Sequence, residues 1–173
     1  HLEKDVWICW VLQELFTMPG RLPMAFKGGT SLSKVYGAIR RFSEDVDVTV
    51  DYKSLDHSID PFDAKTSRTA REKFTELLRT KLADHTKNVI RPHFENLVAR
   101  LAEKPPKPIA ISEDGEKLFI PYPSRFGADE SVFLEFGGRN IIAPGEDHTL
   151  KPYIAAEVPN LQFPEARSEE HTS

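Results

Sequence analysis

Two short groups of residues in the first third of the chain have types and spacings that suit phosphate and metal chemistry. In the first group, Gly28 and Gly29 stand directly before Thr30 and Ser31. Consecutive glycines let a phosphate approach the backbone closely, and the free N–H groups at the start of a following helix attract anions. The two hydroxyl groups would add donors. A tight turn followed by a helix cap has the same sequence, and for an isolated Gly-Gly-Thr the cap is the commoner outcome.

The second group is a pair of carboxylates that follows after about one helix of sequence. Asp45 and Asp47 alternate with valines, so a strand would project both side chains from one face. Two such carboxylates repel each other unless a cation lies between them, and Mg²⁺ prefers hard oxygen ligands. Asp51 has the same parity but lies near the strand end, farther from a shared ion. An isolated Asp-x-Asp is more often a solvated polar face, so the pair needs support from its context.

The order of the two groups supplies that context. A phosphate-binding turn and a carboxylate pair, connected by one helix, are the two halves of a nucleotide and metal site. Such a site can align a phosphoryl group and stabilise its charge without a covalent intermediate. The sequence therefore predicts phosphoryl-transfer chemistry within residues 28–47.

The stretch FKGGTSLSKVYGAIRRFSEDVDVTVD, residues 26–51, carries a family resemblance. It resembles the first motif of DNA polymerase β-like nucleotidyltransferases and, more closely, the AbiEii/AbiGii toxin family. Members of that family share a Gly-Gly-Thr/Ser turn and an Arg-x-Ser-x-Asp-hydrophobic-Asp segment, which Arg41, Ser43, Asp45 and Asp47 match here. Later segments and the N-terminal helix also look like this family, so the resemblance extends to about Ala166, although only the first motif is specific.

The resemblance implies a role for each matching residue. Asp45 and Asp47 would bind Mg²⁺, and the triphosphate of an NTP would be bound by Gly28, Gly29, Thr30, Ser31, Arg41 and Ser43. The superfamily normally adds a third carboxylate from a neighbouring strand. Glu135, between Leu134 and Phe136, fits the hydrophobic-Glu-hydrophobic form of that position. The alternative for Glu135 is a surface residue on an edge strand.

The implied activity is Mg-dependent transfer of NMP from an NTP to an acceptor, such as a tRNA end. By resemblance the protein would be the toxin of a bacterial toxin–antitoxin or phage abortive-infection system, with an antitoxin protein as its partner. A non-catalytic module that binds a nucleotide or an antitoxin is the main alternative. Another two-metal phosphoryl enzyme, such as a nuclease, is a third.

Periodicity predicts the elements that position these residues. Helices are expected at 5–16, from Thr30 or Ser31 to about 40, and at 66–102, where Pro92 should break or kink the pattern into two helices. Strands are expected at 22–26, 45–51, 109–111, 117–123, 131–138 and 148–157, with a hairpin turn between the third and fourth. This order predicts an α+β fold in which helices pack on a mixed β-sheet.

Composition sets broader limits. With 173 residues, a net charge of −4 and 39% hydrophobic residues, the chain can form one globular domain. It has no apolar run of membrane-spanning length, so no membrane partner is expected. The single Cys9 excludes an internal disulfide and favours the cytoplasm, and its place on an apolar helix face argues against a nucleophilic role. Trp7 and Trp10 are expected to be packing residues.

The last seven residues of the chain form a polar segment that resembles no structural element. The heptapeptide RSEEHTS, Arg167–Ser173, looks like the translation of a sequencing adapter; an ordinary disordered tail is the alternative. We therefore expect a nucleotidyltransferase-like domain over residues 1–166, as the N-terminal part of a longer protein, and a non-native tail over 167–173. In the family that the motif resembles, a C-terminal helical part follows, and on this expectation it would be missing here.

Overall fold

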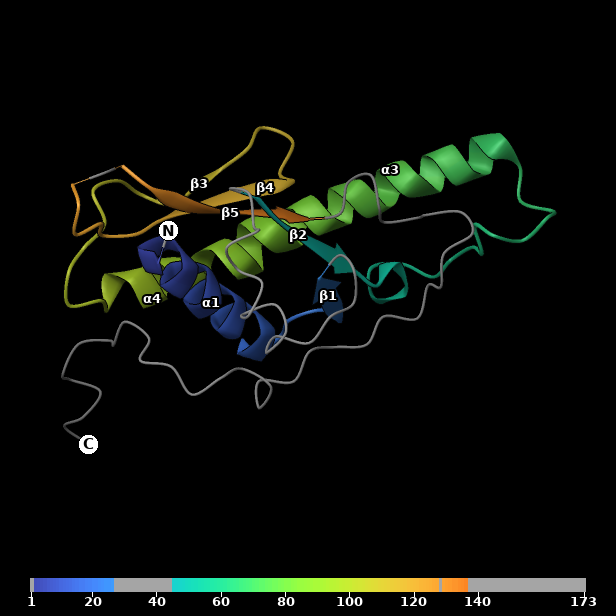
Figure 1. Cartoon of the computed structure of the whole chain (residues 1–173). Coiled ribbons are helices and arrows are strands. Elements are labelled where there is room, and N and C mark those ends of the chain that lie inside the picture. Colours follow the sequence, from blue (N-terminus) through green and yellow to red (C-terminus); the bar gives the residue numbers. More distant parts are fainter. Residues whose placement is uncertain (1, 27–44, 128, 137–173) are drawn as a thin grey trace.

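A computed structural model describes residues 2–26, 45–127 and 129–136, and its centre is a five-stranded sheet. The strands are β1 (Met24–Phe26), β2 (Asp45–Val50), β3 (Ala110–Ile111), β4 (Lys117–Pro121) and β5 (Ser131–Phe136). Their order across the sheet is β1-β2-β5-β4-β3 (Figure 1). The β2 and β5 strands are parallel, whereas every other neighbouring pair is antiparallel. The predicted mixed sheet of an α+β fold is therefore confirmed.

Within the described residues, three α-helices accompany the sheet: α1 (Leu2–Thr17), α3 (Arg68–His85) and α4 (Arg91–Ala99). The first is longer than the predicted 5–16 by about one turn in total. A 3-10 helix, Tyr52–Ser54, follows β2. The Ser67 hydroxyl caps α3 by accepting a hydrogen bond from the Ala70 backbone N–H. No described helix is long and apolar enough to cross a membrane.

The predicted break at Pro92 takes the form of a π-helical segment rather than a gap. Residues Thr86–Ile90 are π-helical and connect α3 directly to α4, in which Pro92 occupies the first turn. Proline has no N–H to donate to the preceding turn, and the first turn of a helix is where this loss costs least. The Thr86 hydroxyl donates to the Leu82 carbonyl at 3.0 Å within this wide turn. The helical region therefore changes its hydrogen-bond pattern without interrupting the chain of helices.

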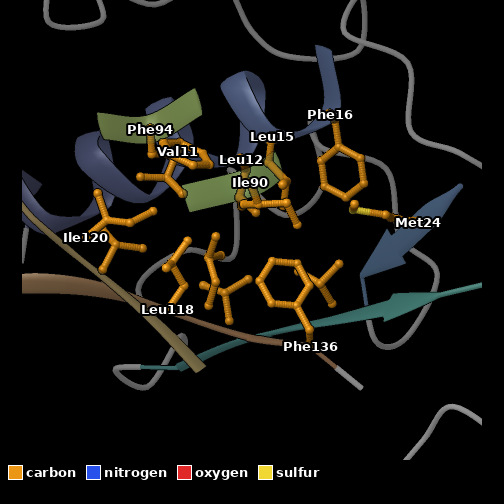
Figure 2. Close-up of a cluster of buried hydrophobic side chains, with 14 of the residues drawn as sticks. Val11, Leu12, Leu15, Phe16, Met24, Ile90, Phe94, Leu118, Ile120 and Phe136 are labelled. Carbon is orange, nitrogen blue, oxygen red and sulfur yellow. The ribbon is translucent and has the colours of Figure 1, made fainter. Parts of the chain in front are cut away.

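The core lies between the helices and one face of the sheet (Figure 2). Alternate residues of the three longer strands are almost completely buried: Val46, Val48, Val50, Leu118, Ile120, Val132, Leu134 and Phe136. Leu12, Leu15 and Phe16 of α1 and Ile90 and Phe94 of the later helices belong to the same cluster. Because one parity of each strand is buried against the helices, the other parity points to the opposite face of the sheet.

The predicted packing roles of the N-terminal helix are confirmed. Trp7 and Trp10 are buried and meet edge to face, with ring centroids 5.3 Å apart. Cys9 is buried beside them, and burial raises the pKa of its thiol to about 12, with a smaller contribution from Asp5. A thiol with that pKa stays protonated at neutral pH, which agrees with a structural role.

Gly115 fixes the β3–β4 hairpin against α3. Its φ is +76°, and a Cβ built on it would lie 2.6 Å from the Cβ of Ala83. Replacing Gly115 with alanine is expected to lower the free energy of unfolding by about 2–5 kcal/mol, the sum of a left-handed backbone penalty and a clash. Gly127, with φ +70° and nothing within 4 Å of its Cβ position, is the matched control and should lose only about 1–2 kcal/mol. Equal urea denaturation midpoints for the two variants would contradict the close contact.

Two half-buried histidines make stability dependent on pH. His85 ends α3 and His93 lies in α4, and the Nε2 atom of each is buried without a hydrogen-bond partner among the described residues. Burial lowers the pKa of both; for His93 it outweighs a hydrogen bond with the Glu14 backbone, and Arg100 lowers the pKa further. Below a pH of about 6.5 the unfolded chain binds protons that the folded chain does not.

We therefore expect the free energy of unfolding to fall as the pH is lowered from 7.5 to 5. Urea denaturation at the two pH values measures this fall. The double variant His85→Gln/His93→Gln, which has neither titrating group, should show a smaller difference between the two pH values. The same difference in both proteins would show that other groups cause the pH dependence.

Candidate active site

The parallel pairing of β2 with β5 brings two of the predicted carboxylates together. The Cα of Asp47 pairs with that of Glu135. The neighbours Val48 and Phe136 are no more than 1% exposed. Asp47 and Glu135 therefore share the face of the sheet opposite the core, which we call the outer face, and both are half-buried. Residues far apart in the sequence form one acidic pair because their strands are adjacent and in register.

The strand that carries Glu135 lies inside the sheet. Among the described strands its position is third of five, between β2 and β4, so the edge-strand part of the alternative for Glu135 is wrong. Like charges opposite each other destabilise neighbouring strands. The Cα of Lys117 on β4 pairs with Glu135 from the other side, which places a cationic residue type in the same row. The row Asp47–Glu135–Lys117 crosses three strands, and its two carboxylates provide negative charge suited to a cation.

Asp45 occupies the position two residues before Asp47 in the same strand, and its Cα pairs with that of Phe133. The backbone thus gives it the same parity as Asp47. A metal bound near this end of the sheet would meet oxygen ligands from two adjacent strands. Among the side chains that the structure describes, no group of three His, Cys, Asp or Glu residues is close enough to hold a metal ion, and the Asp45 side chain lies outside that set.

Asp51, at the end of the strand, has a structural role. Its carboxylate accepts a hydrogen bond from the Lys53 backbone N–H at 3.1 Å and caps the 3-10 helix that follows β2. Its own N–H donates to the Pro23 carbonyl at 2.9 Å. Asp51 therefore stabilises the turn after β2 and stands apart from the acidic pair.

The predicted phosphate-binding residues Gly28, Gly29, Thr30, Ser31, Arg41 and Ser43 lie outside the described residues. The described residues that flank their segment are Phe26 and Asp45. The β1 strand ends at Phe26, whose Cα pairs with that of Val48, next to Asp47. The β2 strand begins at Asp45, two residues after Ser43. The described residues that flank this segment therefore lie near the acidic pair.

The acidic pair suits Mg²⁺ by its donor chemistry. Carboxylate oxygens are the ligands this ion prefers, and it usually binds through one or two carboxylates together with substrate phosphates. Asp47 and Glu135 supply two carboxylates in register, and Asp45 a third in the same strand as Asp47. The residues present therefore fit the ion that the sequence motif implies.

Several outer-face residues were missed by sequence reasoning. Lys117, Phe119 and Phe133 share the face of the acidic pair, and the two phenylalanine rings meet edge to face with centroids 5.0 Å apart. Lys4 reaches the same aromatic pair, with its Nζ 5.7 Å from the Phe133 ring centroid. The alternation within each strand could have shown which residues share a face. It could not have shown that β5 inserts between β2 and β4.

Comparison with known families adds independent information to this geometry. The family model described as nucleotidyl transferase AbiEii toxin, type IV TA system, matches residues 10–168. The match includes β2, β5 and the glycine segment between β1 and β2. Comparison with curated proteins found no match, and comparison with solved structures found none.

Proposed function

The chain belongs to the family of AbiEii nucleotidyl transferase toxins of type IV toxin–antitoxin systems, and on this premise we propose that it transfers NMP from an NTP to a hydroxyl group of a nucleic-acid acceptor. The register of Asp47 with Glu135 carries the proposal. It places two carboxylates on the outer face, near Phe26 and Asp45, the described residues that flank the segment with the Gly-Gly-Thr sequence.

The residues divide the task of positioning the donor. Gly28 and Gly29 would let the triphosphate approach the backbone, and the hydroxyls of Thr30, Ser31 and Ser43 and the guanidinium of Arg41 would donate hydrogen bonds to its oxygens. Asp45, Asp47 and Glu135 would hold Mg²⁺, which when bound supplies charge stabilisation for the phosphoryl group. The carboxylates thereby orient the α-phosphate towards the acceptor.

The reaction follows from that arrangement. An acceptor hydroxyl attacks the α-phosphorus in line and loses its proton to solvent, the new P–O bond forms, and the bond to the β-phosphate oxygen breaks to release pyrophosphate. A tRNA end is the acceptor that the family resemblance suggests, and both substrates would be met in the bacterial cytoplasm. Modification of such an acceptor would make the protein toxic and useful in phage defence. A cognate antitoxin protein would hold that activity in check.

The test uses NTPs labelled at the α or the γ position, with Mg²⁺ and total tRNA. The proposal predicts that α-label enters the RNA while γ-label is recovered as pyrophosphate. Two results would contradict it. Nucleotide-dependent thermal stabilisation without any product would indicate a non-catalytic binding module. Shortened RNA without incorporated label would indicate a nuclease.

A further inference from the structure

An aromatic pair lies next to the acidic pair on the outer face. Phe119 of β4 and Phe133 of β5 are Cα partners, and their rings meet edge to face with centroids 5.0 Å apart and an interplanar angle of 80°. Each lies between two buried core residues of its strand, so both rings point away from the core. Both are half-buried. The part of each ring that remains accessible is a surface on which a flat ligand can stack.

The register joins this pair to the candidate active site. Phe133 precedes Glu135 by two residues on the same strand, which separates the two positions by about 7 Å on one face. The Cα of Phe133 also pairs with that of Asp45. The aromatic pair and the acidic pair are therefore neighbouring rows of the same surface.

A cation borders the aromatic pair. The Nζ atom of Lys4 lies 5.7 Å from the Phe133 ring centroid and 3.8 Å from a carboxylate oxygen of Glu130. Its side chain is 19% exposed, so the ammonium group is held by α1 at this place rather than free in solvent. An aromatic surface next to a cation is the combination that single-stranded nucleic acids bind, because bases stack on rings and phosphates pair with cations.

The strand order indicates which substrate would reach this surface. The β1 strand, which precedes the Gly-Gly segment in the chain, lies on one side of β2. Phe133 of β5 and Phe119 of β4 lie on the other side of β2. In-line transfer places the attacking hydroxyl and the leaving pyrophosphate on opposite sides of the phosphorus. If the triphosphate lies towards β1, the acceptor approaches from the aromatic side.

We propose that Phe119 and Phe133, with Lys4 beside them, form a stacking subsite for the terminal bases of a single-stranded nucleic-acid acceptor. This inference rests on the proposed transfer reaction, because that reaction defines the side from which the acceptor comes. The subsite recognises the π-face that every base has, so it selects a single-stranded end more than a sequence.

The test measures acceptor binding separately from chemistry. Fluorescence anisotropy of a dye-labelled single-stranded RNA tetranucleotide, without NTP or metal, gives its Kd for the wild type and for Phe119→Leu and Phe133→Leu. Leucine keeps an apolar side chain but removes the ring, so each substitution should raise the Kd about tenfold. Phe126→Leu is the control, because Phe126 is 84% exposed in the loop between β4 and β5 and should leave the Kd unchanged.

Lys4→Gln should reduce the salt dependence of binding, lowering the slope of log K against log salt by about 0.7. A Kd that is the same in Phe119→Leu, Phe133→Leu and wild type would overturn the subsite, as would a wild type that does not bind the RNA. Binding that depends on the rings, in a protein that releases no pyrophosphate, would support the subsite and contradict the transfer reaction. The two proposals can thus fail separately.

Discussion

Replacing Asp47 with asparagine is expected to reduce nucleotidyl transfer about a thousandfold. The substitution keeps the shape of the side chain and removes the negative charge that faces Glu135 across the β2–β5 pair. Loss of several kcal/mol of charge stabilisation in phosphoryl transfer corresponds to a rate change of this size. The measurement is the initial rate of α-label incorporation at saturating NTP, compared with the wild type.

Asp51→Asn is the matched control for that variant, since it makes the same chemical change four residues along the chain. The Asp51 side chain caps a 3-10 helix by accepting a backbone hydrogen bond, and an asparagine oxygen can accept the same bond. Its transfer rate should stay within about twofold of the wild type, because the free energy involved in a retained cap is small. If both variants lost activity equally, general charge rather than the acidic pair would be responsible.

Replacing Glu135 with glutamine is expected to lower the transfer rate about a hundredfold and to raise the Mg²⁺ concentration needed for half-maximal rate. The effect is smaller than for Asp47 because Asp45 and Asp47 would still supply two carboxylates from one strand. Glu113→Gln, an exposed residue of the β3–β4 turn, is the control and should behave as the wild type.

The double variant Asp47→Asn/Glu135→Gln extends this test. Residues that act on one bound ion lose their effects together, so the double variant should be little worse than Asp47→Asn alone. If the rate loss of the double variant equals the product of the two single losses, the two carboxylates act independently. That result would contradict a shared metal site.

Local pattern predicted much of this fold. The alternation of valine with polar residues predicted β2 and the face of Asp47, because a strand has a period of two and one side is buried. The apolar residues within 5–16 recur with the helical spacing i, i+3, i+4, and this spacing predicted α1. Pro92 marked the change between α3 and α4, although the π-helical form of that change depends on packing that the pattern does not contain.

Long-range placement could not be predicted in the same way. The sequence pointed to Glu135 as a third carboxylate of the site, but an edge strand would have fitted its pattern equally well. The position of β5 between β2 and β4 depends on how buried faces from distant segments fit together around α1. The aromatic pair had no local signal for the same reason, since Phe119 and Phe133 become neighbours only through the β4–β5 register.

The predicted phosphate-binding residues remain predictions, because Gly28 to Ser43 lie outside the described residues. The fold gives the positions of the described residues that flank their segment, Phe26 and Asp45. These two residues lie in the neighbouring strands β1 and β2. The Cα of Phe26 pairs with that of Val48, so Asp47 lies between Asp45 and the residue opposite Phe26. The strand predicted at 148–157 and the tail at 167–173 also lie outside the described residues.

Binding of Mn²⁺ tests the central claim, that Asp47 and Glu135 form one metal-binding pair, most directly. The free-ion signal in electron paramagnetic resonance, titrated in the presence of a non-hydrolysable NTP analogue, gives the Kd without any need for an acceptor. Asp51→Asn should match the wild type, whereas Asp47→Asn and Glu135→Gln should each raise the Kd about tenfold or more. One Kd shared by all four proteins would contradict the claim.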